Sequence, residues 1–316
     1  MIQKTPLVVC FGEVLWDIFP TYKRIGGAPL NVAYHLNKFG IDSRVITKLG
    51  KDDLGTKIIT ALAKNNISTD QIQIDENSQT GTVFATFDDR NEASYDFLEN
   101  SAWDSIDLRP QDLDIVRKSD AFVFGTLASR KQHTRKTLES LLEAAPYKVF
   151  DVNFRPPHYD IKFVVELMHK ANLIKMNKAE LRQILEEIEK PYTNEEESIK
   201  YIQDHFKCQE IIVSKGSKGG IYYFEDKLFH FPSVEIVIKD TVGSGDSFLA
   251  GFLAEKLTSF DPIETIKKAS SLGAFITSQA GACPEYELED YFLFHTENIF
   301  SDNEITTVTI KNKTEE

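Results

Sequence analysis

Short apolar runs of strand length alternate with longer amphipathic stretches along most of the chain. The runs predict strands at 7–12, 43–50, 121–125, 147–153, 172–177, 210–216 and 234–239. The amphipathic stretches predict helices at 29–40, 53–65, 131–144, 161–170, from 178 onward, and at 194–206, 244–258 and 262–279. This alternation is typical of an α/β fold with a mostly parallel central sheet and helices on both faces.

Two hairpin patterns interrupt the alternation. The β-rich runs 80–88 and 92–99 are joined by a turn-like segment, and a second hairpin falls within 219–232. We expect the first hairpin to stand apart from the main sheet as a small β lid, formed by about 13–25 and 80–103. The sequence has no internal repeat or low-complexity linker, so 1–316 is predicted to be a single domain. The polar tail, about 301–316, is predicted to be mobile or loosely docked.

Composition narrows the class of protein. Hydrophobic residues make up 41% and charged residues 27% of the 316 residues, which is ordinary for a globular protein. No apolar run approaches the roughly 18 residues of a membrane-spanning helix, and the N-terminus lacks the pattern of a signal peptide. We therefore expect a cytoplasmic protein. The formal charge of −13 argues against nucleic acid as a partner.

Cysteine and histidine spacing gives no metal or disulfide signal. Cys10, Cys208 and Cys283 are far apart and odd in number, which predicts buried thiols rather than a disulfide framework or a zinc site. The seven histidines form no H-E-x-x-H pair.

The segment DTVGSGDSF at 240–248 carries the strongest chemical signal. Gly243 and Gly245 precede a strongly helical stretch, so several N–H groups and the helix dipole can converge on one anion. Asp246, in the first helical turn, could then take a proton from a hydroxyl that attacks a phosphoryl group. The alternative is a glycine loop with an aspartate that caps a helix.

Other phosphate signatures fail. The stretch 50–57 has two glycines at Walker-A spacing, but Thr56 and Lys57 stand in the wrong order. No G-x-G-x-x-G follows the first strand, which disfavours an NAD-dependent enzyme.

Two segments together resemble a known family. DTVGSGDSFLAGF is similar to the C-terminal signature of the PfkB (ribokinase-like) carbohydrate kinases, with Ser244 as the one departure, and 26–40 with 49–55 resembles their N-terminal signature. The resemblance covers about 7–284. It implies a ribokinase-like α/β fold and an ATP-dependent kinase that phosphorylates a hydroxyl of a sugar.

The resemblance also implies roles for particular residues. Asp246 would be the catalytic base, with Gly243, Ser244 and Gly245 as the anion hole. Sugar hydroxyls would be bound by Asp17, Gly27 and Asn31, and Asn177 with Glu180 would help place Mg²⁺, Glu180 through water. ATP would lie along Asn177, Ser214, Gly216, Gly219, Thr241, Gly245 and Ala274. Backbone oxygens of Asp240 and Thr241 could bind K⁺. Asn177 and Glu180 also fit an ordinary helix cap.

The sugar is predicted from four further segments. GEVLWD, GGAPLN, FGTLASR and DVNFRPP look like the fructokinase branch of the family, which implies D-fructose, with Tyr95, Phe97 and Arg155 as further sugar contacts. Arg155 could instead pair with the carboxylate of 2-keto-3-deoxygluconate. A phosphorylated fructose would need additional cations, for which Arg24, Arg90 and Arg130 are candidates. A non-catalytic sugar-binding relative is an alternative of a different class.

An apolar face on the lid would need a cover. Two subunits pairing through their lids would provide it, so we predict a homodimer.

Overall fold

The computed structural model describes residues 4–87 and 93–310, and their side chains except those of 85–87 and 93–95. In this part of the chain ten strands form the main sheet. Their order is β14 (Thr306–Thr309), β13 (Lys227–Phe231), β12 (Gly220–Phe224), β11 (Glu210–Ser214), β10 (Leu173–Asn177), β9 (Lys148–Asp151), β8 (Ala121–Gly125), β1 (Leu7–Phe11), β4 (Asp42–Gly50) and β5 (Ile72–Asp75). From β11 to β5 neighbouring strands are parallel. From β14 to β11 neighbouring strands are antiparallel.

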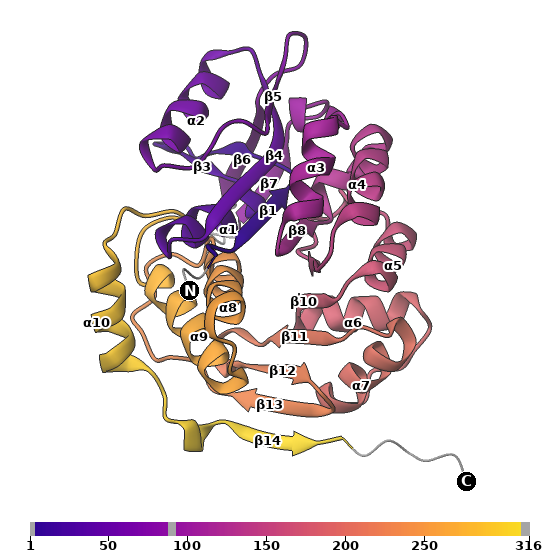
Figure 1. Ribbon diagram of the computed structural model, residues 1–316, viewed down its shortest axis with the longest axis vertical. Helices are drawn as coiled ribbons and strands as arrows, with labels where there is room; N and C mark the ends of the chain where they lie inside the picture. Colours follow the sequence, from indigo (N-terminus) through magenta and orange to yellow (C-terminus); the bar gives the residue numbers. More distant parts are fainter. Residues whose placement is uncertain (1–3, 88–92, 311–316) are drawn as a thin grey trace.

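Each buried strand supplies side chains to two separate cores, because successive residues point to opposite faces of a sheet. In β1, Val8 and Cys10 join one core, while Val9 and Phe11 join the other. The first core is covered by α1 (Ala28–Lys38), α2 (Asp53–Lys64), α8 (Ser244–Ser259), α9 (Pro262–Thr277) and α10 (Leu288–Asn298). The second is covered by α3 (Pro110–Lys118), α4 (Gln132–Ala144), α5 (Ile161–Lys170), α6 (Lys178–Glu187) and α7 (Glu195–Phe206). The two groups of helices lie on opposite sides of the sheet (Figure 1), which confirms the predicted architecture.

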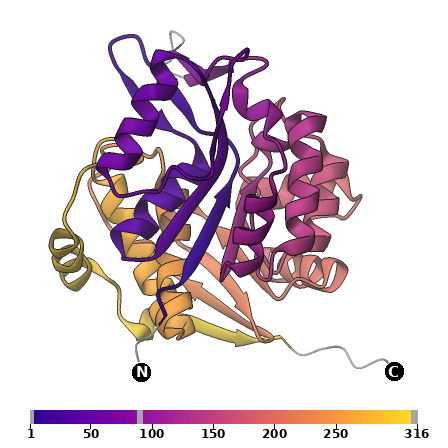
Figure 2. The same cartoon turned by 45° about the horizontal axis from the view of Figure 1, so that its top comes forward.

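A second, smaller sheet stands beside the main one (Figure 2). Its order is β3 (Lys23–Gly26), β2 (Leu15–Ile18), β6 (Gly81–Phe87) and β7 (Ala93–Phe97). The strands β6 and β7 pair antiparallel, so the expected hairpin is confirmed. Short 3₁₀ turns occur at Ala102–Ser105, Leu127–Arg130, Gly216–Lys218 and Asp302–Glu304.

Two predictions near the C-terminal part of the sheet are wrong. The apolar run 234–239 forms no strand, and Val237 and Ile238 are 89% and 62% exposed. The reason is that the free edge of β13 is taken by β14. The tail is therefore not loose as far as it is described, because Thr306–Thr309 adds the terminal strand of the main sheet. The chain over 234–239 instead runs to the end of α9, where Lys239 N–H donates to the Thr277 carbonyl.

Within the described residues no helix has the length and apolar character needed to cross a membrane.

Candidate active site

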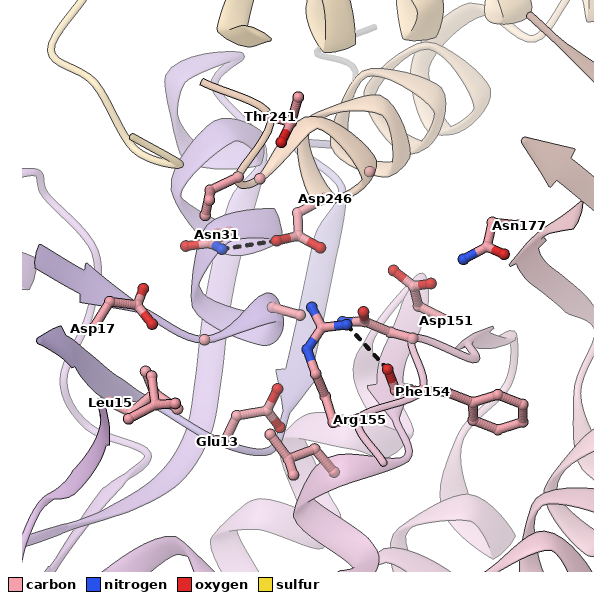
Figure 3. Close-up of a pocket in the computed structure, with 18 of the residues that line it drawn as sticks. Glu13, Leu15, Asp17, Asn31, Asp151, Phe154, Arg155, Asn177, Thr241 and Asp246 are labelled. Atoms are coloured by element: carbon pink, nitrogen blue, oxygen red, sulfur yellow. Dashed lines mark hydrogen bonds between the residues drawn. The ribbon is translucent and has the colours of Figure 1, made fainter. Parts of the chain in front are cut away.

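A cavity of about 570 Å³ opens at the carboxyl ends of the parallel strands, between the small sheet and the start of α8. Ligands of α/β folds bind at this edge of the sheet. The cavity brings together residues from distant parts of the chain (Figure 3). Among the predicted site residues, those that line it are Asp17, Gly27, Asn31, Phe97, Arg155, Asn177, Glu180, Ser214, Thr241, Gly243, Gly245 and Asp246.

The start of α8 is shaped by glycine. Gly243 has φ of 78° and begins the helix, and a Cβ at this position would lie 2.5 Å from the Cβ of Ala282. Only glycine tolerates both the left-handed backbone and this close approach. The first turn of a helix leaves backbone N–H groups without intrahelical partners. Because Gly243 and Gly245 line the cavity, this end of α8 can receive an anion there.

Asp246 follows the glycines and points into the cavity (Figure 3). Its Oδ2 accepts a hydrogen bond of 2.7 Å from the side-chain amide of Asn31 on α1. Burial and the nearby Asp151 carboxylate raise the pKa of Asp246, against the opposing effects of Lys175 and the Asn31 amide. A desolvated carboxylate is a better proton acceptor than one in water.

A buried ion pair lies beneath the helix start. Lys175 Nζ is 2.9 and 2.8 Å from the two carboxylate oxygens of Asp151, and a Cβ on Gly245 would lie 3.3 Å from that ammonium. Burial acts to lower the pKa of Lys175, but the Asp151 carboxylate beside it raises the pKa above its usual value. Positive charge is therefore held next to the glycines of α8.

The part of the cavity beside the small sheet is lined by carboxylates. Burial raises the pKa of Asp17 to about 6 and that of Glu13 to about 7. The exposed guanidinium of Arg155 lowers the pKa of both carboxyls, less than burial raises it. Arg155 donates a hydrogen bond of 3.1 Å to the Phe154 carbonyl (Figure 3). These groups can donate and accept hydrogen bonds with a polyhydroxy ligand.

Asn177 and Glu180 form a helix cap. The Asn177 side chain accepts from the N–H groups of Ala179 and Glu180 at 2.8 and 2.9 Å, and Glu180 accepts from Asn177 N–H at 2.7 Å. The other oxygen of Glu180 accepts from Phe154 N–H at 2.9 Å. Both residues also line the cavity, so the helix cap holds two polar side chains at the edge of the cavity.

Several predicted site residues do not line this cavity. Ser244 lies within the first turn of α8 and Ala274 within α9. Gly216 and Gly219 form the turn before β12, where a Cβ on Gly219 would lie 1.9 Å from the Phe231 carbonyl oxygen. The side chain of Asp240 is held by Arg24, Val242 and Gly281. The side chain of Tyr95 lies outside the described residues.

Two of the three cations considered for a phosphorylated sugar are described, and both are engaged elsewhere. Arg24 pairs with Asp240 at 2.8 Å. Arg130 pairs with Asp104 at 2.8 Å, and both side chains are almost fully buried. Arg90 lies outside the described residues. Neither Arg24 nor Arg130 lines the cavity.

Sequence reasoning missed Glu13, Asp151, Lys175 and Asn153, which also line the cavity. A signal for two of them was present. Lys175 interrupts the apolar run of β10, and Asp151 ends the apolar run of β9. A charge inside or at the end of a buried strand needs a partner, and the neighbouring strands β9 and β10 bring these two together.

Comparison with known proteins gives consistent matches. The chain is 26% identical over 293 residues to a fructokinase of Salmonella typhimurium, covering 86% of this chain and 93% of that one. A fructokinase of Xylella fastidiosa with bound ATP superposes with a TM-score of 0.80 at 19% identity, covering 92% and 98%. A fructokinase double mutant of Vibrio cholerae, bound to fructose, ADP and potassium ion, has a TM-score of 0.80 at 20% identity, with the same coverage.

At these identities the solved structures establish a shared fold. The model of the pfkB family carbohydrate kinases matches residues 7–288. That range includes the small sheet, the cavity and the glycine turn before α8 with Asp246. The chain therefore belongs to the pfkB family of carbohydrate kinases.

Proposed function

We propose that the chain is a fructokinase that transfers the γ-phosphoryl group of MgATP to a hydroxyl of free D-fructose. The observation that carries the proposal is the position of Asp246, half-buried in the cavity beside Gly243 and Gly245 and hydrogen-bonded to Asn31. The similar proteins from Salmonella typhimurium and Xylella fastidiosa are fructokinases, which supports the same activity.

Asp246 is the base in this mechanism. As the sugar oxygen forms its bond to the γ-phosphorus, its proton moves to a carboxylate oxygen of Asp246, and the bond from phosphorus to the β-phosphate oxygen breaks with its electron pair leaving on ADP. Charge that spreads over the phosphoryl oxygens is met by N–H groups at the start of α8 and by the nearby Lys175 ammonium.

The charge of the acceptor region favours a neutral sugar. Glu13, Asp17 and Asp246 all line the cavity, and Arg155 is the exposed cation near them. A phosphate or carboxylate on the sugar would meet more negative than positive charge there. Of the candidate cations for a sugar phosphate, the two that the structure describes, Arg24 and Arg130, are held in ion pairs away from the cavity.

A 2-keto-3-deoxygluconate kinase is the second candidate. The exposed Arg155 guanidinium favours it, because it lines the cavity with hydrogen-bond donors available to a carboxylate. A sugar acid would be oriented with its carboxylate toward Arg155.

Metal binding is part of the proposal. Mg²⁺ would arrive with ATP, and Asn177 and Glu180 at the cavity edge would hold its waters, while K⁺ would use backbone oxygens of Asp240 and Thr241. Both carboxylate oxygens of Glu180 already accept backbone hydrogen bonds, which suits contact through water rather than direct coordination. ATP itself would extend from the glycine turn of α8 past Ser214.

The test is turnover of ATP with fructose, 2-keto-3-deoxygluconate, ribose and fructose 6-phosphate. We expect fructose to have the highest kcat/KM. Asp246→Asn should lower kcat by about 10³-fold or more while nucleotide affinity stays nearly unchanged. Asp290→Asn, which removes an exposed carboxylate on α10, is the matched control. Near-normal turnover by Asp246→Asn would refute the mechanism, and a better sugar acid would favour the second candidate.

A further inference from the structure

Arg24 is built into the hairpin that carries the sugar-facing Asp17. It lies on β3, where its Cα is paired with that of Asp17 on β2. Its guanidinium is 4.7 Å from the centre of the Tyr22 ring, and Tyr22 is stacked on Phe19, which lines the cavity. The arginine is thus held by the small sheet on one side.

Its other contact crosses to the start of the phosphoryl-transfer signature. Arg24 Nη1 donates to Asp240 Oδ2 at 2.8 Å, over a separation of 216 residues. The same oxygen accepts Gly281 N–H at 2.9 Å, and Oδ1 accepts Val242 N–H at 3.0 Å. One carboxylate therefore connects the small sheet, the turn before α8 and the turn after α9.

The segment after α9 leaves room for the contact between Arg24 and Asp240, and it also packs against Gly243 at the start of α8. Gly281 has φ of 87°, and a Cβ there would lie 3.0 Å from Arg24 Nη1. The next residue, Ala282, packs against Gly243 so closely that a Cβ on Gly243 would lie 2.5 Å away. A shift of Asp240 or of Gly281 would therefore move the backbone at Gly243.

Within residues 4–87 and 93–310, no second ion pair joins the small sheet to 240–282. The pair is half-buried, with side-chain exposures of 35% and 21%, so solvent screens it only in part.

We propose that Arg24 is a positioning residue for phosphoryl transfer. Through its contact with Asp240, Arg24 holds the sugar-facing small sheet in a fixed position relative to the glycine turn that receives the phosphoryl group. The inference rests on the proposed kinase function and deepens it. Arg24 touches neither reacting group. It acts by fixing the distance between Asp17 on one side of the cavity and Gly243 on the other.

A link of this kind makes the binding of sugar and nucleotide cooperative. If the sugar fixes β2 and β3, it also fixes Asp240 and the glycine turn, and by thermodynamic linkage the nucleotide strengthens sugar binding by the same factor. We expect fructose to tighten binding of a non-hydrolysable ATP analogue by roughly 5- to 50-fold in the wild-type protein.

Calorimetry measures how strongly fructose tightens binding of the ATP analogue in Arg24→Met and Arg24→Lys. The control is Arg117→Met, because the ion pair of Arg117 with Asp114 is exposed on α3. In Arg24→Met we expect the tightening to fall to below about 2-fold, with each ligand alone binding nearly as in the wild type. We also expect kcat to fall by about 10-fold or more. Arg24→Lys should keep part of both effects, because the charge remains.

Three outcomes are informative. If folded Arg24→Met keeps the wild-type kcat and the wild-type tightening of nucleotide binding by fructose, the inference is overturned. Turnover by the wild-type protein would still leave the proposed function intact. Absence of wild-type turnover with every sugar overturns the proposed function first. If Arg24→Met fails to fold, a double-mutant cycle with Arg24→Lys and Asp240→Asn replaces it. The inference is overturned if the two substitutions change the coupling between fructose and nucleotide additively.

Discussion

Glu13 shows what the fold does to a single side chain. It directly follows Gly12 at the end of β1, is 5% exposed, and lines the cavity next to Arg155. No described side chain donates a hydrogen bond to its carboxylate, although its own backbone N–H and that of Ala28 act to lower its pKa. Burial outweighs them and raises the pKa of Glu13 to about 7.

We predict that Glu13→Gln stabilises the unliganded protein at alkaline pH. The folded-state pKa of about 7 lies above the ordinary value of 4.5. Between pH 4.5 and pH 7 the Glu13 carboxyl therefore keeps its proton in the folded protein but releases it in the unfolded chain. Stability is therefore lost as the pH rises through this window. Removing the charge should add about 1–3 kcal/mol at pH 8, and the gain should shrink toward pH 5. Thermal unfolding of both proteins across pH 5–8 measures it.

Glu166→Gln on the exposed face of α5 is the control for Glu13→Gln. It should change stability by less than about 0.5 kcal/mol at every pH. A gain in Glu13→Gln that is the same at pH 5 and pH 8 would contradict the assigned pKa.

At the residue scale, sequence reasoning singled out Asp246 and its glycines, which line the cavity, but missed Glu13 and the buried Lys175–Asp151 pair. Asp246 and its glycines follow from one local pattern, because a turn and a helix start depend on adjacent residues. Glu13, Asp151 and Lys175 come together only when their strands meet in the sheet. A charge in a buried strand indicates that a partner is needed, but spacing along the chain does not identify that partner. Asn31 is predicted to be a sugar contact and lines the cavity, and its side-chain amide also donates to Asp246 on α8.

At the scale of the elements, β14 forms one edge of the main sheet. It pairs with β13 over Thr306 to Thr309, and Val308 packs against the second core. Its sequence is polar, so hydrophobic periodicity alone could not distinguish it from a loose tail. The run 234–239 has the opposite character, apolar and yet unpaired, because pairing requires a free edge as well as a suitable sequence.

We predict that removing 306–316 lowers the thermal midpoint by about 2–6 °C, because the ladder with β13 and the packing of Val308 are lost. Removing only 311–316 is the matched control, and the difference between the two midpoints measures the contribution of 306–310. The longer truncation should also aggregate faster, since β13 becomes an unpaired edge. Equal midpoints for the two truncations would show that β14 contributes nothing to stability.

For the molecule as a whole, the small sheet has two unlike faces. Leu15, Asp17 and Val83 point into the cavity, so the alternating residues Trp16 and Phe84 point away from it. Trp16 is covered, with its indole N–H bonded to the Leu54 carbonyl. Phe84 is 47% exposed on that outer face. Four strands with an exposed aromatic ring on one face provide a surface that a second copy could cover.

We therefore predict a homodimer that pairs through the small sheets, which light scattering at micromolar concentration can detect. Phe84→Glu should convert it to a monomer, because a carboxylate would be buried without a partner in the interface. Phe292→Glu on α10, a side chain of similar exposure, should leave the dimer intact. If the dimer also orders the sheet over the cavity, the Phe84→Glu monomer should bind fructose more weakly than the wild type while its affinity for nucleotide alone is retained. A wild-type protein that is monomeric at this concentration would refute the interface, and the cavity would then have to close within one subunit.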